Sequence, residues 1–312
     1  MPFQSDKSLY YGVTRKKQGV SIKTKTTIKR LARKILSAMH LRPKAAPPFL
    51  RVLHPFHPSE VVHRQLSPSL RERVRWIASD GLNTVEDKDN ELFAMFSAVA
   101  GVHKWRHYFP VYTELLSPLR ESPIKLLEIG VARGGSLKLW QQFLHPKSTI
   151  VGIDLDPDCH QFENLAKNVH VRIGSQTDPK FLNQLIAEFG QFHVILDDGS
   201  HIPSHMVASF NILFENGLSP GGCYIVEDIL TNYWTDYRDF PVSFVDFTKH
   251  LVDLMHAHYW SAQSADEFKE GVKREFTVPR ITKLLRRIDI HDSIFVFHKQ
   301  STTREVPYHI HT

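Results

Sequence analysis

The feature that most constrains the fold is the alternation of short apolar runs with helical windows along the middle of the chain. The apolar runs predict strands over residues 125–129, 149–154, 169–173, 193–196 and 223–226. Helices are predicted between and after them, over residues 136–143, 158–166, 179–188, 203–214 and 242–258. Strands joined by helices in this way are typical of an α/β, Rossmann-like, doubly wound and mostly parallel sheet.

The two ends of this pattern differ from its middle. Residues 285–290 and 293–298 alternate with period two around a turn, which predicts that the sheet ends in an antiparallel hairpin. A helical pattern over residues 91–119 stops at Ser122-Pro123, and one helix is expected at residues 70–77 of a proline-interrupted segment. The sequence therefore divides into a basic arm, an N-terminal helical extension or lid, an α/β domain and a tail, over residues 1–46, 47–120, 121–300 and 301–312.

The net charge of +6 is concentrated in the arm. Residues 1–46 contain twelve Lys or Arg and one acidic residue, whereas the remaining residues contain 27 basic and 32 acidic ones. A slightly acidic body does not suit a groove that tracks phosphates, so no nucleic-acid partner is expected. The arm also predicts a basic amphipathic helix, which could contact anionic lipid, dock on the body or belong to a disordered tail or a transit peptide. Its apolar positions are Ile28, Leu31, Ile35, Leu36 and Met39.

Cysteine usage and hydropathy bear on the compartment. The chain has two cysteines, Cys159 and Cys223, without C-x-x-C spacing, and it has no run of 18 apolar residues. Its N-terminal residues lack the apolar segment of a secretory signal. These features predict a cytoplasmic location, with peripheral contact to the inner face of a membrane if the arm binds lipid.

A glycine-rich turn follows the first predicted strand, in the segment Leu126-Leu-Glu-Ile-Gly-Val-Ala-Arg-Gly-Gly-Ser136. The spacing Gly130-x-x-x-Gly134-Gly135 departs from the G-x-G-x-x-G that accommodates a dinucleotide pyrophosphate. Glu128 places a carboxylate beside the turn, which suits a cationic or hydroxyl-rich ligand such as S-adenosylmethionine better than an anion. The alternative is a tight strand-to-helix turn with a solvated Glu128.

Polar residues also follow the other strands, where an open parallel sheet binds its ligand. Asp154 lies roughly 20 residues beyond the glycine turn and is placed to accept hydrogen bonds from a ribose diol, with Asp156 as the second choice. Either acid can instead cap the helix that follows. The candidate cofactor contacts at the strand ends are Glu128, Gly130, Gly134, Ser136, Asp154, Asp156 and Asp197.

Three further carboxylates, Asp198, Glu227 and Asp228, follow the fourth and fifth strands. Parallel pairing brings such strand ends together, and like charges in one place favour a bound cation with oxygen ligands, such as Mg²⁺ or Mn²⁺. His201 is expected to point at the same cluster, where an imidazole can act as a base at neutral pH. The alternative is an ordinary set of exposed or helix-capping acids.

Aromatic residues flank these motifs in the sequence. Trp105 and Tyr108 precede the first strand, while Tyr233 and Trp234 follow the fifth, and exposed rings of this kind can stack on a sugar or an adenine. Tyr112 and Trp140 lie on predicted helices and are interpreted as packing residues. The first four are therefore the candidate substrate contacts.

Three segments together resemble class I methyltransferases: Glu128-x-Gly130-x-x-x-Gly134-Gly135, Asp197-Asp-Gly-Ser-His201 and Val226-Glu-Asp228. Over residues 105–299 the chain is similar to metal-dependent sugar O-methyltransferases of the macrocin and mycinamicin type and to the cephalosporin-hydroxylase-like and rhamnosyl O-methyltransferase group. The resemblance implies an S-adenosylmethionine cofactor, Mg²⁺ or Mn²⁺ at the three carboxylates, and His201 as the base. It also implies that a segment including Ser175, Gln176 and Asp178 lies along the adenosine.

The sequence thus predicts an S-adenosylmethionine-dependent and metal-dependent O-methyltransferase. The expected acceptor is a small molecule or glycan with vicinal hydroxyls: a natural product, a glycolipid or a polysaccharide. A homo-oligomer is compatible with the sequence. The alternatives are a nicotinamide-dependent oxidoreductase on the same fold and a membrane-associated binding protein with a degenerate methyltransferase fold.

Overall fold

The computed structural model describes residues 90–308, except residues 240, 261, 263 and 272–274. The predictions of an amphipathic helix in the arm and of a helix at residues 70–77 lie outside the described residues. Among the described helices, none has both the length and the apolar content needed to cross a bilayer.

A seven-stranded sheet forms the centre of this part of the chain, in the order β3-β2-β1-β4-β5-β7-β6. The first five strands are mutually parallel, and β7 is antiparallel to both β5 and β6. The chain leaves β1 toward β2 and β3 on one side and later returns to β4 and β5 on the other. The strand order therefore reverses between β1 and β4, where an open α/β sheet binds its ligand. The strands are β1 (Lys125–Ile129), β2 (Thr149–Asp154), β3 (Val169–Ile173), β4 (Phe192–Asp197), β5 (Leu218–Val226), β6 (Leu285–His291) and β7 (Ile294–Lys299).

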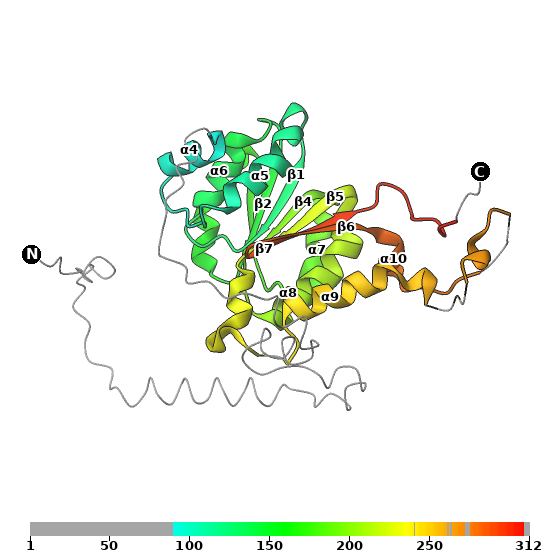
Figure 1. Ribbon diagram of the computed structural model, residues 1–312. Coiled ribbons are helices and arrows are strands. Elements are labelled where there is room, and N and C mark those ends of the chain that lie inside the picture. Colours follow the sequence, from blue (N-terminus) through cyan, green and yellow to red (C-terminus); the bar gives the residue numbers. More distant parts are fainter. Residues whose placement is uncertain (1–89, 240, 261, 263, 272–274, 309–312) are drawn as a thin grey trace, which may run out of the picture. The chain divides into compact units, whose positions relative to one another are not determined.

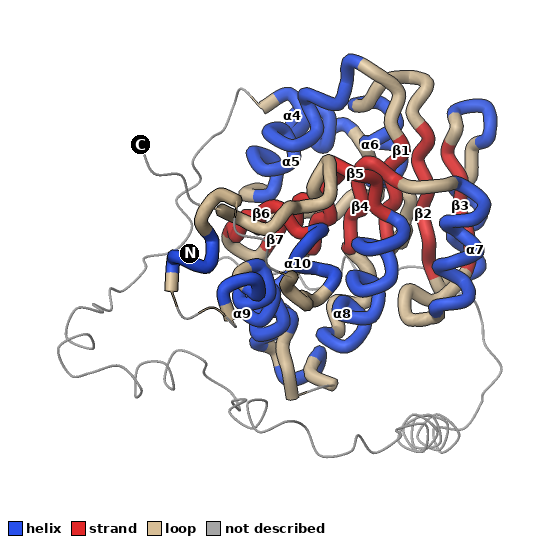
Figure 2. The backbone as a smooth tube through the Cα atoms, turned by 90° about the vertical axis from the view of Figure 1, so that its right-hand side faces the viewer, coloured by secondary structure: helices blue, strands red, loops and turns tan. Residues whose placement is uncertain are grey.

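Helices cover both faces of the sheet (Figures 1 and 2). One face packs against α4 (Glu91–Ala98), α5 (Tyr108–Leu116) and α6 (Gly135–Phe143). The other packs against α7 (Pro179–Phe189), α8 (Pro203–Ile212), α9 (Phe244–Met255) and the short α10 (Arg280–Leu284). Because α5 shares its core cluster with strand residues such as Leu126, the predicted helical extension contributes directly to the core of the sheet.

Successive strand residues alternate between the two cores. Leu126 and Ile150 are buried under α5 and α6, whereas their neighbours Leu127 and Val151 are buried under α7 and α8. Strands with both faces covered are apolar throughout, because neither face meets water. This explains why the strands appear as continuous apolar runs in the sequence.

The predicted elements agree with the structure, apart from their ends and one helix. The first three strands begin and end where predicted, and the hairpin forms β6 and β7. The helix predicted over residues 158–166 is wrong, since the segment forms two short 3₁₀ turns, Pro157–Phe162 and Leu165–Lys167. Asn164 between them pairs with Val169 instead of continuing a helix. The helix predicted to end at Phe214 ends at Ile212 and continues as a π turn, Leu213–Gly217.

Candidate active site

The turns after β1 and β4 touch at the point where the strand order reverses. Gly130 has a φ of 95°, and a Cβ atom on it would lie 2.3 Å from the carbonyl oxygen of Asp198. A side chain is excluded there by both the backbone conformation and the space. The glycine turn that the sequence singled out thus allows the loop carrying Asp198 to lie directly against the end of β1.

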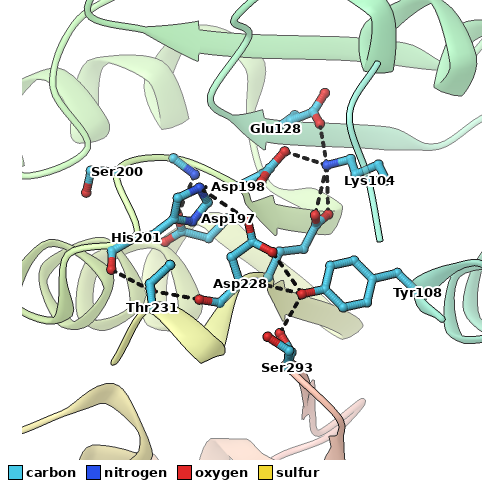
Figure 3. A network of polar contacts seen from close by, with 12 residues as sticks. Lys104, Tyr108, Glu128, Asp197, Asp198, Ser200, His201, Asp228, Thr231 and Ser293 are labelled. Carbon is cyan, nitrogen blue, oxygen red and sulfur yellow. Dashed lines mark hydrogen bonds and ion pairs between the residues drawn. The ribbon is translucent and has the colours of Figure 1, made fainter. Parts of the chain in front are cut away.

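Three predicted site residues converge beside this contact: Asp198, His201 and Asp228 (Figure 3). Each offers one potential metal-ligand atom, and these atoms lie within 4.8 Å of one another. His201 Nε2 is 3.8 Å from Asp198 Oδ1 and 3.6 Å from Asp228 Oδ2. The three side chains are 17–22% exposed, so the group can be reached by a ligand.

The backbone at this group is unusual. His201 and Asp228 have φ values of 57° and 52°, which residues other than glycine adopt at a cost. The Thr231 hydroxyl lies 3.1 Å from the carbonyl oxygen of His201 and 2.7 Å from that of Asp228, and its single proton can serve either. The surrounding loops therefore hold both residues in conformations that direct their side chains to one place.

The remaining carboxylate oxygens of the group are already occupied. Asp198 Oδ2 accepts a hydrogen bond from Lys104 Nζ at 2.5 Å. The Tyr108 hydroxyl lies 2.9 Å from Asp228 Oδ1 and 3.0 Å from the carbonyl oxygen of Ser293, and its single proton can serve either. The same hydroxyl accepts the backbone N–H of Asp228. Each carboxylate thus has one oxygen near a donor and one oxygen that faces His201. The donor is Lys104, which precedes α5, for Asp198 and Tyr108, the first residue of α5, for Asp228.

Glu227, the third predicted metal ligand, has its carboxylate engaged by donors of the protein. Its side chain is 1% exposed and accepts hydrogen bonds from Lys104 at 2.9 and 3.0 Å and from the hydroxyl of Tyr112. Adjacent residues at a strand end point in different directions, so Glu227 turns toward α5 while Asp228 turns toward His201. The cluster of possible ligands found in the described residues accordingly contains Asp228 but not Glu227.

Glu128 lies next to Lys104 and does not belong to the Asp198–His201–Asp228 cluster. One oxygen accepts a hydrogen bond from the Ser136 hydroxyl at 2.8 Å, and the other lies 3.6 Å from Lys104 Nζ and accepts no hydrogen bond from the described residues. The expected solvated or ligand-facing Glu128 is therefore fully buried. Ser136, predicted to contact the cofactor, holds this carboxylate in place.

The electrostatics of the cluster show an excess of negative charge. Burial disfavours the Lys104 ammonium, but Asp198, Glu227 and Glu128 together raise its pKa well above the usual value. Burial and the charge of Asp198 raise the pKa of Glu227, and burial raises that of Glu128 to about 7 although Lys104 opposes the shift. One ammonium does not balance four neighbouring carboxylates, so the site would gain from a further cation.

Asp197 does not lie at the position expected for a cofactor contact. Its carboxylate is buried and accepts hydrogen bonds from the hydroxyls of Ser209 and Tyr224, at 2.7 and 3.1 Å, and from the amide of Gln176 at 3.2 Å. Gln176 Oε1 in turn accepts the backbone N–H of Ser200 at 2.9 Å. Asp197 and Gln176 therefore fix the loop that carries His201, because both side chains are engaged within the protein.

The other predicted cofactor contacts lie along the edges of the glycine turn. Asp154 accepts the backbone N–H groups of Val131, Ala132 and Asp156, which lower its pKa although burial opposes them. It therefore shapes the turn. Gly134, with a φ of 69°, precedes α6, and Ser175 pairs with Thr177 at 2.9 Å.

Two of the predicted cofactor acids act as caps. Asp156 accepts the backbone N–H of Asp158 at the start of a 3₁₀ turn, and Asp178 accepts that of Lys180 at the start of α7. Both side chains belong to exposed residues, and the capping alternative raised for Asp156 is confirmed.

The predicted substrate contacts separate into two kinds. Trp105, Tyr233 and Trp234 are 44–52% exposed, whereas Tyr108 is fully buried and serves Asp228 instead of a substrate. Tyr237, whose ring centroid is 6.4 Å from that of His201 and 5.9 Å from that of Trp234, extends the exposed aromatic surface toward the site. Aromatic groups next to the site therefore come from the segment after β5.

Sequence reasoning missed Lys104 and misread Tyr112 as a packing residue only. Lys104 is one cation in the segment His103-Lys-Trp-Arg-His107, and no spacing rule links it to acids about 25 to 120 positions away. Tyr112 does pack in the core, but its hydroxyl also serves Glu227. The i, i+4 spacing of Tyr108 and Tyr112 could have indicated that both hydroxyls lie on one side of a helix and can reach the same cluster of acids.

No protein-family model matches the chain, but individual proteins do. Over 173 residues the chain is 36% identical to the 8-demethyl-8-alpha-L-rhamnosyl tetracenomycin-C 2'-O-methyltransferase of Streptomyces olivaceus, covering 51% of this chain and 44% of that protein. Over 144 residues it is 37% identical to the demethylmacrocin O-methyltransferase of Streptomyces fradiae, covering 43% and 35%. The chain is similar to sugar O-methyltransferases.

These sugar O-methyltransferase relatives are longer than the matched segment, which covers less than half of either. Among solved structures, the MycE methyltransferase from the mycinamycin pathway, in complex with Mg, SAH and mycinamycin VI, is similar with a TM-score of 0.57 at 24% identity. The similarity covers 68% of this chain and 53% of that one. It confirms the predicted fold class, a Rossmann-like, mostly parallel sheet ending in an antiparallel hairpin.

Proposed function

We propose that this chain is an S-adenosylmethionine-dependent and divalent-metal-dependent O-methyltransferase that acts on a sugar hydroxyl. The observation that carries the proposal is the convergence of Asp198, His201 and Asp228 at the switch point of the sheet. It occurs in a chain that is 36% identical over 173 residues to a methyltransferase of a rhamnosylated natural product.

The donor set fits a hard divalent cation. Asp198 and Asp228 each direct one free oxygen toward the shared space, and the cluster around them carries more negative than positive charge. Oxygen ligands favour Mg²⁺ or Mn²⁺, which retain some of their positions for water or substrate. We therefore assign Asp198 and Asp228 as the residues that would hold the ion.

The residues around the glycine turn fit S-adenosylmethionine. Asp154 has accepted three backbone N–H groups, and a carboxylate has room for about one more donor, such as a ribose hydroxyl. Glu128 places a buried carboxyl group beside the same turn, and above its pKa of about 7, which burial raises, its charge favours a cationic ligand over a diphosphate. The missing G-x-G-x-x-G spacing argues in the same direction, against a nicotinamide cofactor.

His201 is the proposed base. When bound, the divalent ion lowers the pKa of the acceptor hydroxyl, and S-adenosylmethionine supplies the methyl group. The hydroxyl oxygen forms a bond to the methyl carbon as the carbon–sulfur bond breaks, and the hydroxyl proton passes to His201 Nε2, which faces the two carboxylates. The reacting groups are positioned by Asp198, Asp228 and the loop around His201. This positioning supplies a further share of the rate enhancement.

The exposed aromatic residues support a glycosylated acceptor. Tyr237 lies beside His201, and Trp234 lies beside Tyr237. Such rings can cover the apolar face of a sugar or of the group that bears it. We propose a natural product, glycolipid or polysaccharide with vicinal hydroxyls as the acceptor class. The relative from Streptomyces olivaceus acts on a rhamnosyl tetracenomycin, according to its name.

The function is tested by incubating the purified chain with S-adenosylmethionine and acceptors of these three kinds, and following methyl transfer by mass spectrometry. We expect transfer to a glycosylated acceptor that excess EDTA abolishes and excess Mg²⁺ restores. Full activity in EDTA would contradict the metal role. Thermal stabilisation by NAD but not by S-adenosylhomocysteine would instead favour the nicotinamide-dependent alternative.

A further inference from the structure

Ser293 lies in the turn between β6 and β7 and contacts the segment that follows β5. Its hydroxyl accepts a hydrogen bond from the backbone N–H of Leu230 at 2.9 Å, and its carbonyl oxygen accepts that of Ile229 at 3.0 Å. The residue just before these two is Asp228, whose carboxylate faces His201 (Figure 3). The hairpin that ends the sheet therefore reaches the active site through Ser293.

The conformation of Ser293 is costly for a serine. Its φ is 62°, in a two-residue turn between His291 and Ile294, which pair with each other. Turn positions of positive φ favour glycine or asparagine, and glycine adopts such a φ at no steric cost. Glycine has no hydroxyl, however, and could not accept the N–H of Leu230. The contacts of the buried Ser293 side chain therefore explain this residue better than the turn itself does.

The pairing of β5 with β7 is interrupted at Asp228. The strands are antiparallel, and their last pair is Val226 with Phe295. The same register, continued by two residues, would place Asp228 opposite Ser293, yet Ser293 accepts the N–H groups of the two residues after Asp228. Asp228 is thus left outside the ladder with a φ of 52°, and its own N–H is accepted by the Tyr108 hydroxyl at 3.2 Å. Ser293 and Tyr108 therefore hold the backbone on both sides of Asp228.

We propose that Ser293 is a positioning residue for the methyl transfer: by accepting two consecutive N–H groups, it keeps Asp228 in its positive-φ conformation and its carboxylate aimed at the site. The inference rests on the proposed function, since it gives Asp228 an ion to hold. Asp228 Oδ2 lies 3.6 Å from His201 Nε2 in this conformation. Without the contacts to Ser293, the chain at Asp228 can relax to an ordinary negative φ, which would turn the carboxylate away from His201.

The experiment measures the dissociation constant of the full-length chain for Mn²⁺, by electron paramagnetic resonance of free Mn²⁺ at equilibrium. Ser293→Gly removes the hydroxyl but adopts a φ of 62° without strain, so its urea midpoint should stay close to that of the wild type. We expect Mn²⁺ to bind about tenfold more weakly, as is typical when a group that orients a metal ligand is lost. Unchanged Mn²⁺ affinity in Ser293→Gly would overturn the inference.

Two further single variants control for the effect of glycine. Asn168→Gly is the matched control, because Asn168 has a φ of 52° and lies before β3, outside the Asp198–His201–Asp228 cluster. It should bind Mn²⁺ as the wild type does, and a loss equal to that of Ser293→Gly would refute a specific role for Ser293. Ser293→Ala, which lacks the hydroxyl but keeps a Cβ atom, should show the same weakening as Ser293→Gly and replaces it if the glycine variant does not fold.

A double variant shows whether Ser293 acts through Asp228. Asp228→Asn alone should weaken Mn²⁺ binding by at least about tenfold. Adding Ser293→Gly in that background should change the affinity by less than about twofold, because the carboxylate that Ser293 positions is already gone. A merely structural role of the hairpin would instead lower the urea midpoint of Ser293→Gly and leave the two effects on Mn²⁺ additive. Additive effects would therefore overturn the inference.

Failure of the proposed function gives a different result. If the wild type binds no Mn²⁺, or if Asp228→Asn binds it as tightly as the wild type does, the metal-dependent function is contradicted and the role of Ser293 falls with it. If Asp228→Asn weakens binding while Ser293→Gly and Ser293→Ala do not, the function stands and only the role of Ser293 is refuted.

Discussion

At the scale of single residues, function depends on side chains held in costly conformations. His201 has a positive φ, and its backbone carbonyl lies within hydrogen-bond distance of the Thr231 hydroxyl. Strain of this kind persists where the surrounding structure overdetermines it, which is common at active sites. The positive φ of His201 therefore limits which residues can replace it without disturbing the loop.

Replacing His201 by asparagine should remove the base without disturbing the loop, because asparagine tolerates a positive φ better than alanine. We expect kcat for methyl transfer to fall by about 10²- to 10⁴-fold, with unchanged binding of S-adenosylhomocysteine by calorimetry. His160→Asn, at a side chain that is 62% exposed, serves as the matched control. An unaltered kcat in His201→Asn would exclude its role as the base.

Glu128 makes the stability of the metal-free protein depend on pH. Burial raises the pKa of Glu128 to about 7, above the ordinary value of 4.5, so the folded state binds the proton more tightly than the unfolded state. Its ionisation therefore destabilises the fold as the pH rises from about 4.5 to 7, by at most about 1.4 kcal/mol per pH unit. Urea unfolding in EDTA should show wild type losing stability relative to Glu128→Gln across this window. A constant difference would contradict the shifted pKa.

At the scale of elements, the site depends on two loops that lie in contact. The turn after β1 and the loop after β4 meet where Gly130 approaches the carbonyl of Asp198. This contact sets the distance between the expected cofactor side of the site and the Asp198–His201 loop. The steric effect of this contact can be separated from backbone strain. Gly221 has a similar φ but free space around it, so it reports the strain alone.

Gly130→Ala should destabilise the protein by roughly 3 kcal/mol or more, since the new Cβ meets backbone 2.3 Å away at a φ of 95°. Gly221→Ala is the matched control, with a φ of 78° and its nearest contact at 3.9 Å. Strain alone should cost the control about 1 kcal/mol. Urea unfolding of both variants measures the difference, and equal losses would show that the contact with Asp198 contributes nothing.

At the scale of the whole molecule, charge separates the arm from the remainder of the chain. Twelve basic residues lie within residues 1–46, whereas the remainder carries an excess of acids. A basic amphipathic segment binds anionic lipid through both charge and apolar contact. Membrane contact through the arm and a peripheral cytoplasmic location stay predictions, because these residues lie outside those that the structure describes.

Deleting residues 1–46 should separate lipid binding from methyl transfer. We expect loss of binding to vesicles containing anionic phosphatidylserine, measured by cosedimentation, with kcat for methyl transfer within about twofold of the full chain, since no predicted site residue lies in the arm. Full-length chain and vesicles of neutral phosphatidylcholine are the controls. If the deletion abolished methyl transfer but left lipid binding intact, the assignment of lipid binding to residues 1–46 and of methyl transfer to the remaining residues would be wrong.

The fold was largely predictable from local pattern. Buried parallel strands such as Thr149–Asp154 are apolar along their whole length, and turns of Gly, Pro and Ser separate them from helices. Prediction failed at residues 158–166, where the polar segment has helical spacing but Asn164 finds a backbone partner in Val169. Short segments of this kind are decided by tertiary hydrogen bonds, which outweigh weak helix propensity.

The site was only partly predictable, because its acids are adjacent in the sequence but differ in orientation. Asp197 and Asp198 share one strand end, yet Asp197 is buried under α8 and Asp198 faces His201. Glu227 and Asp228 likewise diverge, the first toward Lys104 and Tyr112 and the second toward His201. Which member of each pair reaches the site depends on the face of the sheet to which it points.

The sequence by itself determined the strands, their mostly parallel arrangement and the strand ends that carry the polar residues, because apolar periodicity and turn chemistry act over a few neighbouring positions. Only the tertiary structure decided that Lys104 lies among Glu128, Asp198 and Glu227. It also decided that Tyr112 contacts Glu227 and that Tyr108 contacts Asp228. Those contacts join residues that are between 24 (128 − 104) and 123 positions apart. Electrostatic pairing at such separations leaves no trace in local pattern, since it is set by how helices pack onto the sheet.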